Sequence, residues 1–563
     1  MTQDYERTTE EPVPDSATQY MVRMRDGIRL ATDVYLPGRT QSAAGPPAET
    51  VLVRLPYDKN SRYVFFEWVA KIFTARGYAM VVQDVRGKFR SEGETLGFAG
   101  EANDGYDTID WIVAQQWSNG IVGMFGDSYY GFTQWAAVSS GHRALRAIVP
   151  RVTSAELLGA PCVQGGVRDV PWLVHADYVS HYWTDRHVYS RELDWSLRPL
   201  TEVFEDLFRS LGARSAAYDA SVPHRVPLPV YPDGHPFDAR PVPVLHAVGW
   251  FDNLSIVSMR DYEALARRPA WAAVQYLTAD SVDHENYHLS QAPIAEADDH
   301  GVNDEALARM LAKYTEPALD FFDVFLKGTK DASTLPRVSW HLGHEGYHES
   351  PCWPPPGAGE HLLYLTRLAE AAGRAGADGG LAGSAPEAEE AGEWTYDPDD
   401  LVPSSVPNSF AFLHEFPDES AAARRSDVLS FVTEAAAEPL DLAGPVDLLI
   451  AVSSTAPSAY VFAKLLDEAP DGSARLVVRG QGELTDVSGT ERVRLEMGHT
   501  GYRLRPGHRF RLNIASSDFP EYMRHPGTSE NPWLAVTTEP STQRLISRPD
   551  APAALRLTVL PGA

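Results

Sequence analysis

The sequence places one serine where it could act as a nucleophile. Ser128 lies within Gly126–Gly131 (GDSYYG), between the short apolar run Gly120–Phe125 and the helix-compatible run Phe132–Ser140. A serine hydroxyl attacks a carbonyl carbon only when a base takes its proton. A sharp turn from a strand into a helix exposes that hydroxyl and directs backbone N–H groups at the developing oxyanion. The second glycine comes one position later than in the G-x-S-x-G signature, so an ordinary Gly/Ser turn remains an alternative for this segment alone.

An acid and a base follow the serine in the order that such a nucleophile requires. Asp252 comes just after the apolar run Pro243–Gly249, and His284 comes after the next such run, Ala272–Thr278. In α/β-hydrolases the order along the chain is Ser, then Asp or Glu, then His. Asp252 would therefore hold the imidazole of His284, and His284 would take the Ser128 proton. The competing acids are Asp280 and Asp283, and the competing bases are His288 and His300.

The elements around these residues predict a parallel sheet flanked by helices. The segment Tyr20–Pro37 alternates apolar and polar residues on either side of an Asp-Gly turn and predicts a β-hairpin. Buried strands are indicated at Thr50–Leu55 and Tyr78–Gln83, and helical spacing at Phe65–Arg76 and Asp104–Gln115. Buried strands that alternate with helices form parallel βαβ units, so the predicted fold class is α/β.

The composition and the hydrophobic periodicity of the sequence change along the chain, which predicts several domains. Its 563 residues are too many for one hydrophobic core. We predict an α/β-hydrolase domain from residues 1–152 and 237–330, interrupted by a helical cap at residues 153–236, where helical spacing and aromatic residues replace strand signals. Short strands with frequent turn residues in 331–563 predict a C-terminal all-β jelly-roll domain. Its Ala/Gly/Glu-rich tract, Ala369–Gly392, is expected to be a mobile loop.

Composition limits the partners and the location. A formal net charge of −28 disfavours nucleic acid and anionic membranes, because phosphate groups bind clustered Lys and Arg. The chain contains no apolar run of the roughly 18 residues that would span a membrane. Its first residues lack the basic start and apolar run of a secretory signal, so we expect a cytoplasmic location. Two cysteines, Cys162 and Cys352, are too few for a disulfide framework.

Short motifs over nearly the whole chain carry a family resemblance. The Ser128 segment, with its following tyrosine and delayed glycine, and Gly249–Asp252 (GWFD) are similar to the nucleophile and acid motifs of the cocaine esterase-like (CocE/NonD) hydrolases. The related X-Pro dipeptidyl-peptidases share this resemblance. The other matching segments are Arg25–Leu30, Arg54–Lys59, Asp84–Gly87, Ser91–Gly93, Phe321–Gly328 and Ser516–Pro520.

The resemblance implies a role for each matching residue. Ser128 would be the nucleophile, Asp252 the orienting acid and His284 the base. The Tyr57 hydroxyl and the Tyr129 backbone N–H would form the oxyanion hole. One segment departs from the family, which usually has Gly-Pro-Trp just before its histidine, where this chain has Thr278–Asp283 (TADSVD). The acids in that stretch are expected to raise the basicity of the imidazole.

Other chemistries remain open from the residues alone. His284-Glu285-Asn286-Tyr287-His288 matches the zinc-protease motif H-E-x-x-H, with Glu316 as a candidate third ligand. Such a zinc-dependent hydrolase needs both histidines on one helical face, but the flanking residues lack an apolar helical stripe. An acyltransferase with an amine or alcohol acceptor would use the same triad, and a non-catalytic binding module is the third alternative. The cluster His341, His344 and His348 is interpreted as a β-turn of the jelly roll.

We therefore predict a serine hydrolase of the esterase or peptidase type that forms an acyl-enzyme with a small acyl substrate. The cap supplies candidate substrate-binding residues whose side chains suit a medium-sized, partly aromatic or apolar acyl group: Trp172, His175, Tyr182 and Trp183. We expect neither a cofactor nor a metal for this reaction. The expected partner is a small-molecule ester or amide, and a second copy of the chain, in a homodimer, is a further candidate.

Overall fold

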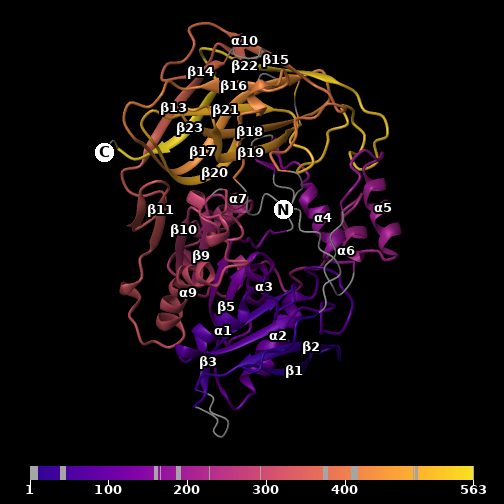
Figure 1. Cartoon of the computed structure of the whole chain (residues 1–563), viewed down its shortest axis with the longest axis vertical. Helices are drawn as coiled ribbons and strands as arrows, with labels where there is room; N and C mark the ends of the chain where they lie inside the picture. Colours follow the sequence, from indigo (N-terminus) through magenta and orange to yellow (C-terminus); the bar gives the residue numbers. More distant parts are fainter. Residues whose placement is uncertain are drawn as a thin grey trace.

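The computed structural model describes most of the chain as two sheet-based regions and a helical region beside them (Figure 1). The described residues are 10–561 except 39–45, 158–162, 165–166, 185–191, 227, 292, 372–377, 407–415, 486 and 488–491. Among them, no helix combines the length and the apolar composition that crossing a bilayer requires.

Ten described strands form the N-terminal sheet, in the order β1-β2-β4-β3-β5-β6-β9-β10-β11-β12. Neighbouring strands are parallel from β4 to β11, and an antiparallel hairpin closes each edge. This confirms the predicted α/β class and the predicted N-terminal hairpin. The strands are β1 (Thr18–Arg23), β2 (Arg29–Tyr35), β3 (Ala48–Leu55), β4 (Ala79–Asp84), β5 (Ser118–Asp127), β6 (Leu145–Arg151), β9 (Val244–Gly249), β10 (Gln275–Asp280), β11 (Val338–Leu342) and β12 (Gly346–Ser350).

Helices cover both faces of this sheet. Val51 and Val53 of β3 pack into one apolar cluster with α1 and α9, whereas Leu52 between them packs into another cluster with α2 and α3. Because both faces are buried, the strands read as nearly continuous apolar runs. The helices are α1 (Phe66–Ala75), α2 (Glu101–Val113), α3 (Ser128–Ser139), α7 (Ser255–Ala266), α8 (Pro269–Ala272) and α9 (Asp304–Phe325).

The carboxyl ends of the parallel strands meet at one edge of the sheet, as they must when every strand runs the same way. There β3 ends before Tyr57, β5 ends at Asp127 immediately before Ser128, β9 ends before Asp252, and β10 ends before His284. The sheet topology alone therefore gathers residues that are more than two hundred positions apart in the sequence.

The region between β6 and β9 contains three described helices, but it is not purely helical. These helices are α4 (Leu173–His181), α5 (Thr201–Leu211) and α6 (Ala216–Asp219). Two short strands, β7 (Val163–Gln164) and β8 (Val167–Arg168), also lie here, and β8 pairs with β19 of the C-terminal domain. The expectation that strand signals vanish in the cap is therefore wrong at this point. Two-residue strands are too short to leave a periodic signal in the sequence.

The C-terminal region is an all-β domain, as predicted. Its apolar core is continuous with residues of β9, α7, β10 and β11. Described strands follow the order β15-β22-β17-β23-β13-β14-β16-β21-β18-β19, with β20 paired to β17. They are β13 (Gly359–Thr366), β14 (Gly379–Ala382), β15 (Glu390–Tyr396), β16 (Leu429–Val432), β17 (Leu440–Ser454), β18 (Ala459–Glu468), β19 (Ala474–Leu484), β20 (Val493–Leu504), β21 (Arg509–Ala515), β22 (Ser541–Ser547) and β23 (Ala554–Val559).

Two expectations about the C-terminal half need correction. The histidine cluster Trp340–His348 is not a turn of the jelly roll, because β11 and β12 extend the N-terminal sheet and β11 runs parallel to β10. The tract Ala369–Gly392 is not one loop: residues 372–377 lie outside the described residues, and the rest includes the end of α10 (Leu368–Ala371), β14 and the start of β15. Gly379 serves close packing, since a Cβ there would lie 2.5 Å from the Phe431 ring.

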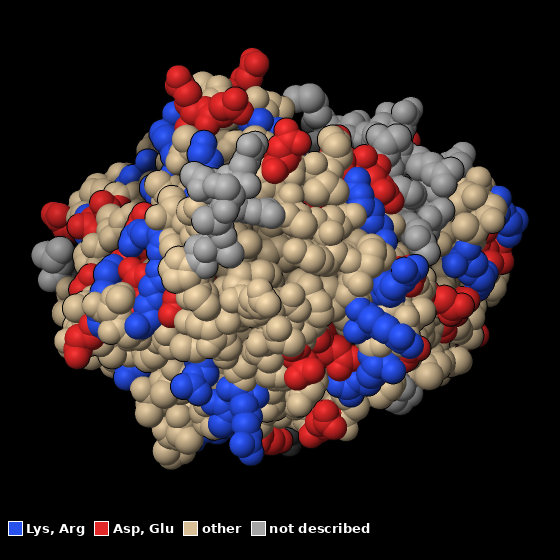
Figure 2. Space-filling view, turned by 90° about the horizontal axis from the view of Figure 1, so that it is seen from below, with Lys and Arg blue, Asp and Glu red and all other residues tan. Residues whose placement is uncertain are grey.

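Charged side chains are mixed on the face of the molecule seen from below (Figure 2). Lys and Arg alternate there with Asp and Glu around a broad area of uncharged residues, and do not merge into one continuous basic surface. This face is the end of the N-terminal sheet region that lies away from the all-β domain.

Candidate active site

Ser128 lies at a tight turn between β5 and α3. It is the first residue of α3, and its φ of 49° falls in the left-handed region that residues with a side chain rarely adopt. Backbone strain of this kind persists only where the surroundings impose it, and it is concentrated at functional sites. The first N–H groups of α3 have no partner within the helix, so the turn also offers backbone donors next to the serine.

Close packing explains both glycines of the nucleophile segment. A Cβ on Gly126 would lie 2.1 Å from the ring of Tyr130, and a Cβ on Gly131 would lie 2.5 Å from Cγ2 of Thr153. Thr153 cannot easily move, because its hydroxyl donates a 2.6 Å hydrogen bond to the Ser128 carbonyl. The second glycine is thus required where α3 approaches the chain after β6, one residue later than in the G-x-S-x-G pattern.

Asp252 and His284 form a close pair beside this turn. His284 Nδ1 lies 2.7 Å from Asp252 Oδ1, and the Asp252 side chain is fully buried. Backbone hydrogen bonds hold the two loops together, since Phe251 N–H donates to the Val282 carbonyl at 3.1 Å. Gly249 permits this approach, because a Cβ there would lie 2.5 Å from the same carbonyl oxygen.

The charge of Asp252 controls the protonation of His284. Burial lowers the pKa of His284, but the Asp252 carboxylate outweighs burial, so the net pKa lies above the ordinary value of about 6.5. Glu285 and Asp127 act in the same direction. Because Nδ1 faces Asp252, the other ring nitrogen, Nε2, is the atom available for proton transfer.

A second set of contacts joins the turn at Ser128, called here the nucleophile turn, to residues 281–288 after β10, called here the histidine loop. Asp127, the residue before Ser128, accepts hydrogen bonds from Arg151 Nε at 2.8 Å and from Tyr314 Oη at 3.0 Å. The Asn286 side chain donates to Asp127 at 3.2 Å and accepts from Arg151 at 2.9 Å. Asn286 lies two residues after His284 and has a φ of 65°. These contacts fix the position of both loops relative to each other.

Tyr57 and Tyr129 border the same space from the other side. The Tyr57 ring makes edge-to-face contacts with Tyr63, Tyr130 and Tyr182, and its hydroxyl lies 3.4 Å from that of Tyr178. The Tyr129 hydroxyl donates to Glu101 at 2.8 Å. This bond fixes the side chain of Tyr129, and its backbone N–H belongs to the second residue of α3.

A cavity of about 90 Å³ brings most of the expected site residues together. Ser128, His284, Tyr57 and Tyr129 line it, and so do three of the four expected cap residues, namely Trp172, His175 and Tyr182. Trp183 is placed differently: its indole is buried behind the Tyr129 ring, at a centroid distance of 5.3 Å, and is not part of the lining. Tyr178, another aromatic residue of the cap that the sequence offers for the pocket, also lines it. The lining residues that the sequence did not single out are Tyr63, Phe98, Leu157, Val174, Asn253 and Leu254.

Burial affects the one cap histidine in this lining. It lowers the pKa of His175 to about 4, so this imidazole is neutral near pH 7. Tyr182 stacks on Tyr178 at 4.8 Å. The cap therefore presents aromatic faces and one neutral imidazole to the cavity. Asn253, outside the cap, could have been predicted from the sequence because it directly follows Asp252.

The competing acids and bases lie outside this cavity. Asp283 is buried and accepts hydrogen bonds from the backbone N–H groups of Glu285 and Tyr287, which shapes the histidine loop. His288 faces Asp280, with Nε2 3.6 Å from Oδ1. His300 stacks on Tyr287 at 4.2 Å.

The H-E-x-x-H residues do not form a zinc-protease site. Residues 284–288 form a turn rather than a helix, and His284 and His288 face different carboxylates. Glu316 pairs instead with Arg76, at 3.0 Å, on the surface. The motif therefore matches in letters but lacks the helical geometry that puts both imidazoles on one ion.

Comparison with known proteins agrees with this architecture. The family model for X-Pro dipeptidyl-peptidase (S15 family) matches residues 26–286, and the model for the X-Pro dipeptidyl-peptidase C-terminal non-catalytic domain matches residues 330–555. A cocaine esterase from Rhodococcus sp. (strain MB1 Bresler) is 30% identical to this chain over 557 residues, which covers 91% of this chain and 92% of that protein. The chain belongs to the cocaine esterase-like branch of the X-Pro dipeptidyl-peptidase (S15) family. This S15-family protein is a serine ester or peptide hydrolase.

Solved structures share the whole fold of this hydrolase. An α-amino acid ester hydrolase superposes with a TM-score of 0.77 at 23% identity, covering 99% of this chain and 100% of that one. A CocE/NonD family hydrolase from Staphylococcus aureus superposes with a TM-score of 0.62 at 16% identity, covering 97% and 93% of the two chains. At these identities the likeness establishes the arrangement of domains and not the substrate.

The close approach at Gly131 predicts the effect of a single methyl group. Gly131→Ala forces a clash with Thr153, which should destabilise the protein by about 1–3 kcal/mol and reduce turnover, because the Ser128 carbonyl is bonded to the same threonine. The thermal midpoint and ester turnover measure this. Gly359→Ala is the matched control, since a Cβ there meets nothing within 4 Å. Thr153→Ser added to Gly131→Ala should restore part of the loss, and equal midpoints for Gly131→Ala and Gly359→Ala would contradict the packing explanation.

Proposed function

We propose that this S15-family hydrolase cleaves a small carboxylic ester through an acyl-enzyme on Ser128, with His284 as the base and Asp252 as the residue that orients it. The observation that carries the proposal is the 2.7 Å contact between His284 and Asp252, at the cavity that Ser128 also lines. Three groups from three strand ends supply what nucleophilic catalysis requires: a hydroxyl, an imidazole and a buried carboxylate.

The proposed reaction has two halves. Ser128 Oγ attacks the ester carbonyl while His284 Nε2 takes its proton, and the resulting imidazolium is stabilised by Asp252. The same proton then passes to the departing alcohol, which leaves the acyl group on Ser128. In the second half, His284 takes a proton from water as the water oxygen attacks the acyl-enzyme. The imidazolium then returns this proton to Ser128 Oγ as the bond to the acyl group breaks, which releases the acid and the free enzyme.

The oxyanion of each tetrahedral intermediate would be held by two donors. The Tyr129 backbone N–H lies at the start of α3, where backbone donors lack helical partners. The Tyr57 hydroxyl is the second candidate. Its ring is fixed by three aromatic neighbours, which supports a preorganised donor rather than one that must be ordered during the reaction.

The lining of the cavity favours an apolar acyl group and an ester rather than a dipeptide amide. Release of a dipeptide needs a carboxylate that recognises the free amine of the substrate, yet the residues described as lining this cavity include no Asp or Glu. The acids of the cap that could recognise such an amine are Asp169, Asp177 and Asp185. Asp169 pairs with Arg260, Asp177 pairs with His181, and Asp185 lies outside the described residues. The resemblance to a cocaine esterase over 91% of the chain supports the same choice.

Covalent labelling tests the nucleophile. A fluorophosphonate probe should label the wild type with or without a chelator, and Ser128→Ala should lose both labelling and ester turnover. Ser139→Ala, in the same helix, is the matched control and should keep both. Turnover that survives Ser128→Ala but stops with chelator would support the zinc alternative, and the absence of labelling and turnover across a panel of esters would support a binding module. Adding alcohol or amine acceptors to the panel distinguishes hydrolysis from acyl transfer.

The pH dependence of kcat/KM tests the base. His284 must be neutral to take the Ser128 proton, so kcat/KM should fall as the pH decreases through a pKa above about 6.5. Asp252→Asn removes the charge that raises this pKa, so the acid limb should move to lower pH while the maximal rate falls, by up to about 10⁴-fold. Glu316→Gln, a surface carboxylate, is the control. An unchanged acid limb in Asp252→Asn would contradict the assignment.

Removing one hydroxyl tests the oxyanion hole. Tyr57→Phe keeps the ring and its packing but deletes the donor, so kcat should fall roughly 10²- to 10³-fold with little change in KM. Tyr347→Phe is the matched control, since its hydroxyl donates to Asp280 and neither residue lines the Ser128 cavity. Equal kcat values in the two variants would exclude Tyr57 as an oxyanion donor.

A further inference from the structure

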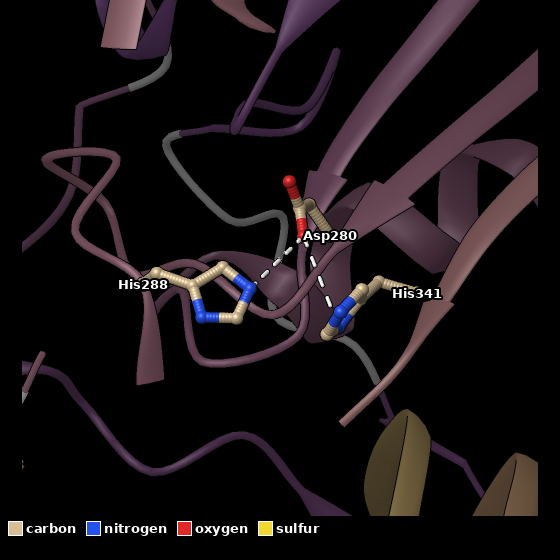
Figure 3. Close-up of side chains that lie close together, drawn as sticks. All are labelled: Asp280, His288 and His341. Carbon is tan, nitrogen blue, oxygen red and sulfur yellow. Dashed lines mark ion pairs between the residues drawn. The ribbon is translucent and has the colours of Figure 1, made fainter. Parts of the chain in front are cut away.

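Next to the histidine loop lies a second cluster of polar groups that the proposed reaction does not use. Asp280 closes β10, His341 lies on the neighbouring strand β11, and His288 follows the loop that begins after Asp280 (Figure 3). The parallel register that pairs Ala279 with Trp340 puts Asp280 beside His341. An antiparallel bridge between Val282 and His288 brings the third side chain back to the same strand end. The backbone therefore determines where all three groups lie.

We propose that Asp280, His288 and His341 bind a first-row divalent transition metal ion such as Zn²⁺ or Co²⁺. His288 Nε2 lies 3.6 Å and His341 Nδ1 4.0 Å from Asp280 Oδ1, and one ligand atom from each residue lies within 4.8 Å of the others. Bonds of about 2.0–2.2 Å to one tetrahedral ion separate its ligands by roughly 3.3–3.6 Å. Small side-chain rotations close the remaining difference.

Hydroxyl groups orient all three candidate ligands. Tyr347 donates to Oδ2 of Asp280 at 2.8 Å, and the Ser281 backbone N–H donates to Oδ1, the oxygen that lies near the two rings, at 2.7 Å. Ser290 lies 3.1 Å from His288 Nδ1, so that Nε2 faces Asp280. Ser281 lies 2.8 Å from His341 Nδ1. Coordination through Nε2 of His341 would keep this last bond, and coordination through Nδ1 would exchange it for the metal. Outer contacts of this kind accompany ligands in metal sites.

Space for additional ligands lies next to the cluster. Asp280 and His288 line a cavity of about 210 Å³. It shares no lining residue with the Ser128 cavity, so the two are separate. This is room for the waters that complete the coordination shell.

The charges around this cavity favour a transition metal over Ca²⁺ or Mg²⁺. Lys313, Arg151 and Arg309 line the cavity as well, together with one further carboxylate, Asp298. Arg151 is paired with Asp127 at 2.8 Å and Arg309 with Asp298 at 3.4 Å. These cations reduce the attraction that a hard ion would need, because Ca²⁺ and Mg²⁺ depend on several oxygen ligands and negative charge. Two imidazoles with one carboxylate bind Zn²⁺, Co²⁺ or Ni²⁺ through nitrogen ligands instead.

The consequence of binding would be structural. An ion held by β10, β11 and His288 would fasten the end of the loop that carries His284, whereas the serine reaction proceeds without it. Metal binding should therefore raise the thermal midpoint and leave fluorophosphonate labelling of Ser128 insensitive to chelator. Failure of this proposal would leave the proposed esterase function untouched, because the two are measured by different readouts.

Titration of the chelator-treated full-length chain with Co²⁺ and Zn²⁺ tests the site. Wild type and Ser128→Ala should each bind one ion per chain by calorimetry, show a visible Co²⁺ spectrum and gain thermal stability. His288→Gln and Asp280→Asn should each weaken binding at least tenfold, while Mg²⁺ should not compete. His348→Gln, on β12, is the matched control, since its imidazole pairs with Glu345 in the turn before that strand.

Two variants keep the test decisive if one of them misfolds. His288 lies on a loop, so His288→Gln should retain the wild-type thermal midpoint without metal even if Asp280→Asn does not. Equal Co²⁺ affinity in wild type and His288→Gln, or the absence of any Co²⁺ and Zn²⁺ binding by the wild type, would overturn the proposal.

Discussion

The close approach of two strand ends is the constraint on which the site depends. Trp250 N–H bonds to the Asp280 carbonyl at 2.8 Å and Phe251 N–H to the Val282 carbonyl, so the chain after β9 is tied to the chain after β10. Only a residue without Cβ fits at Gly249. Asp252 then meets His284 because their backbones are already paired, and little side-chain freedom is lost in forming the contact.

Buried charges extend this arrangement beyond the pair itself. The Asp127 carboxylate accepts hydrogen bonds from Arg151, Tyr314 and Asn286, and these bonds link the nucleophile turn to the histidine loop. A buried carboxylate in the low dielectric of the interior is stabilised only when such donors surround it. The left-handed conformations of Ser128 and Asn286 are maintained by the same network, so strain at the turn is offset by contacts that also orient the base.

The sequence predicted those elements in which apolar residues recur at a regular spacing, and it missed elements that lack such a spacing. The α/β sheet, its first hairpin, the helix at Asp104 and the all-β C-terminal domain each bury a regular apolar face. The assignment of β11 and β12 to the N-terminal sheet was missed because a short alternating strand fits either sheet equally well. The order Ser128, Asp252, His284 was readable because each follows an apolar run, whereas the position of Trp183 behind Tyr129 depends on tertiary packing alone.

The stretch before His284, where this chain departs from its family, has a physical explanation. Asp283 accepts the backbone N–H groups of Glu285 and Tyr287 and so builds the turn that carries the imidazole. Burial raises the pKa of Asp283 well above its usual range, and the backbone N–H groups that it accepts act in the opposite direction. Asp280 instead faces His288 and His341, away from the serine. Asp283 thus shapes the loop by hydrogen bonds and Asp280 belongs to the separate polar cluster, which leaves Asp252 as the carboxylate in contact with His284.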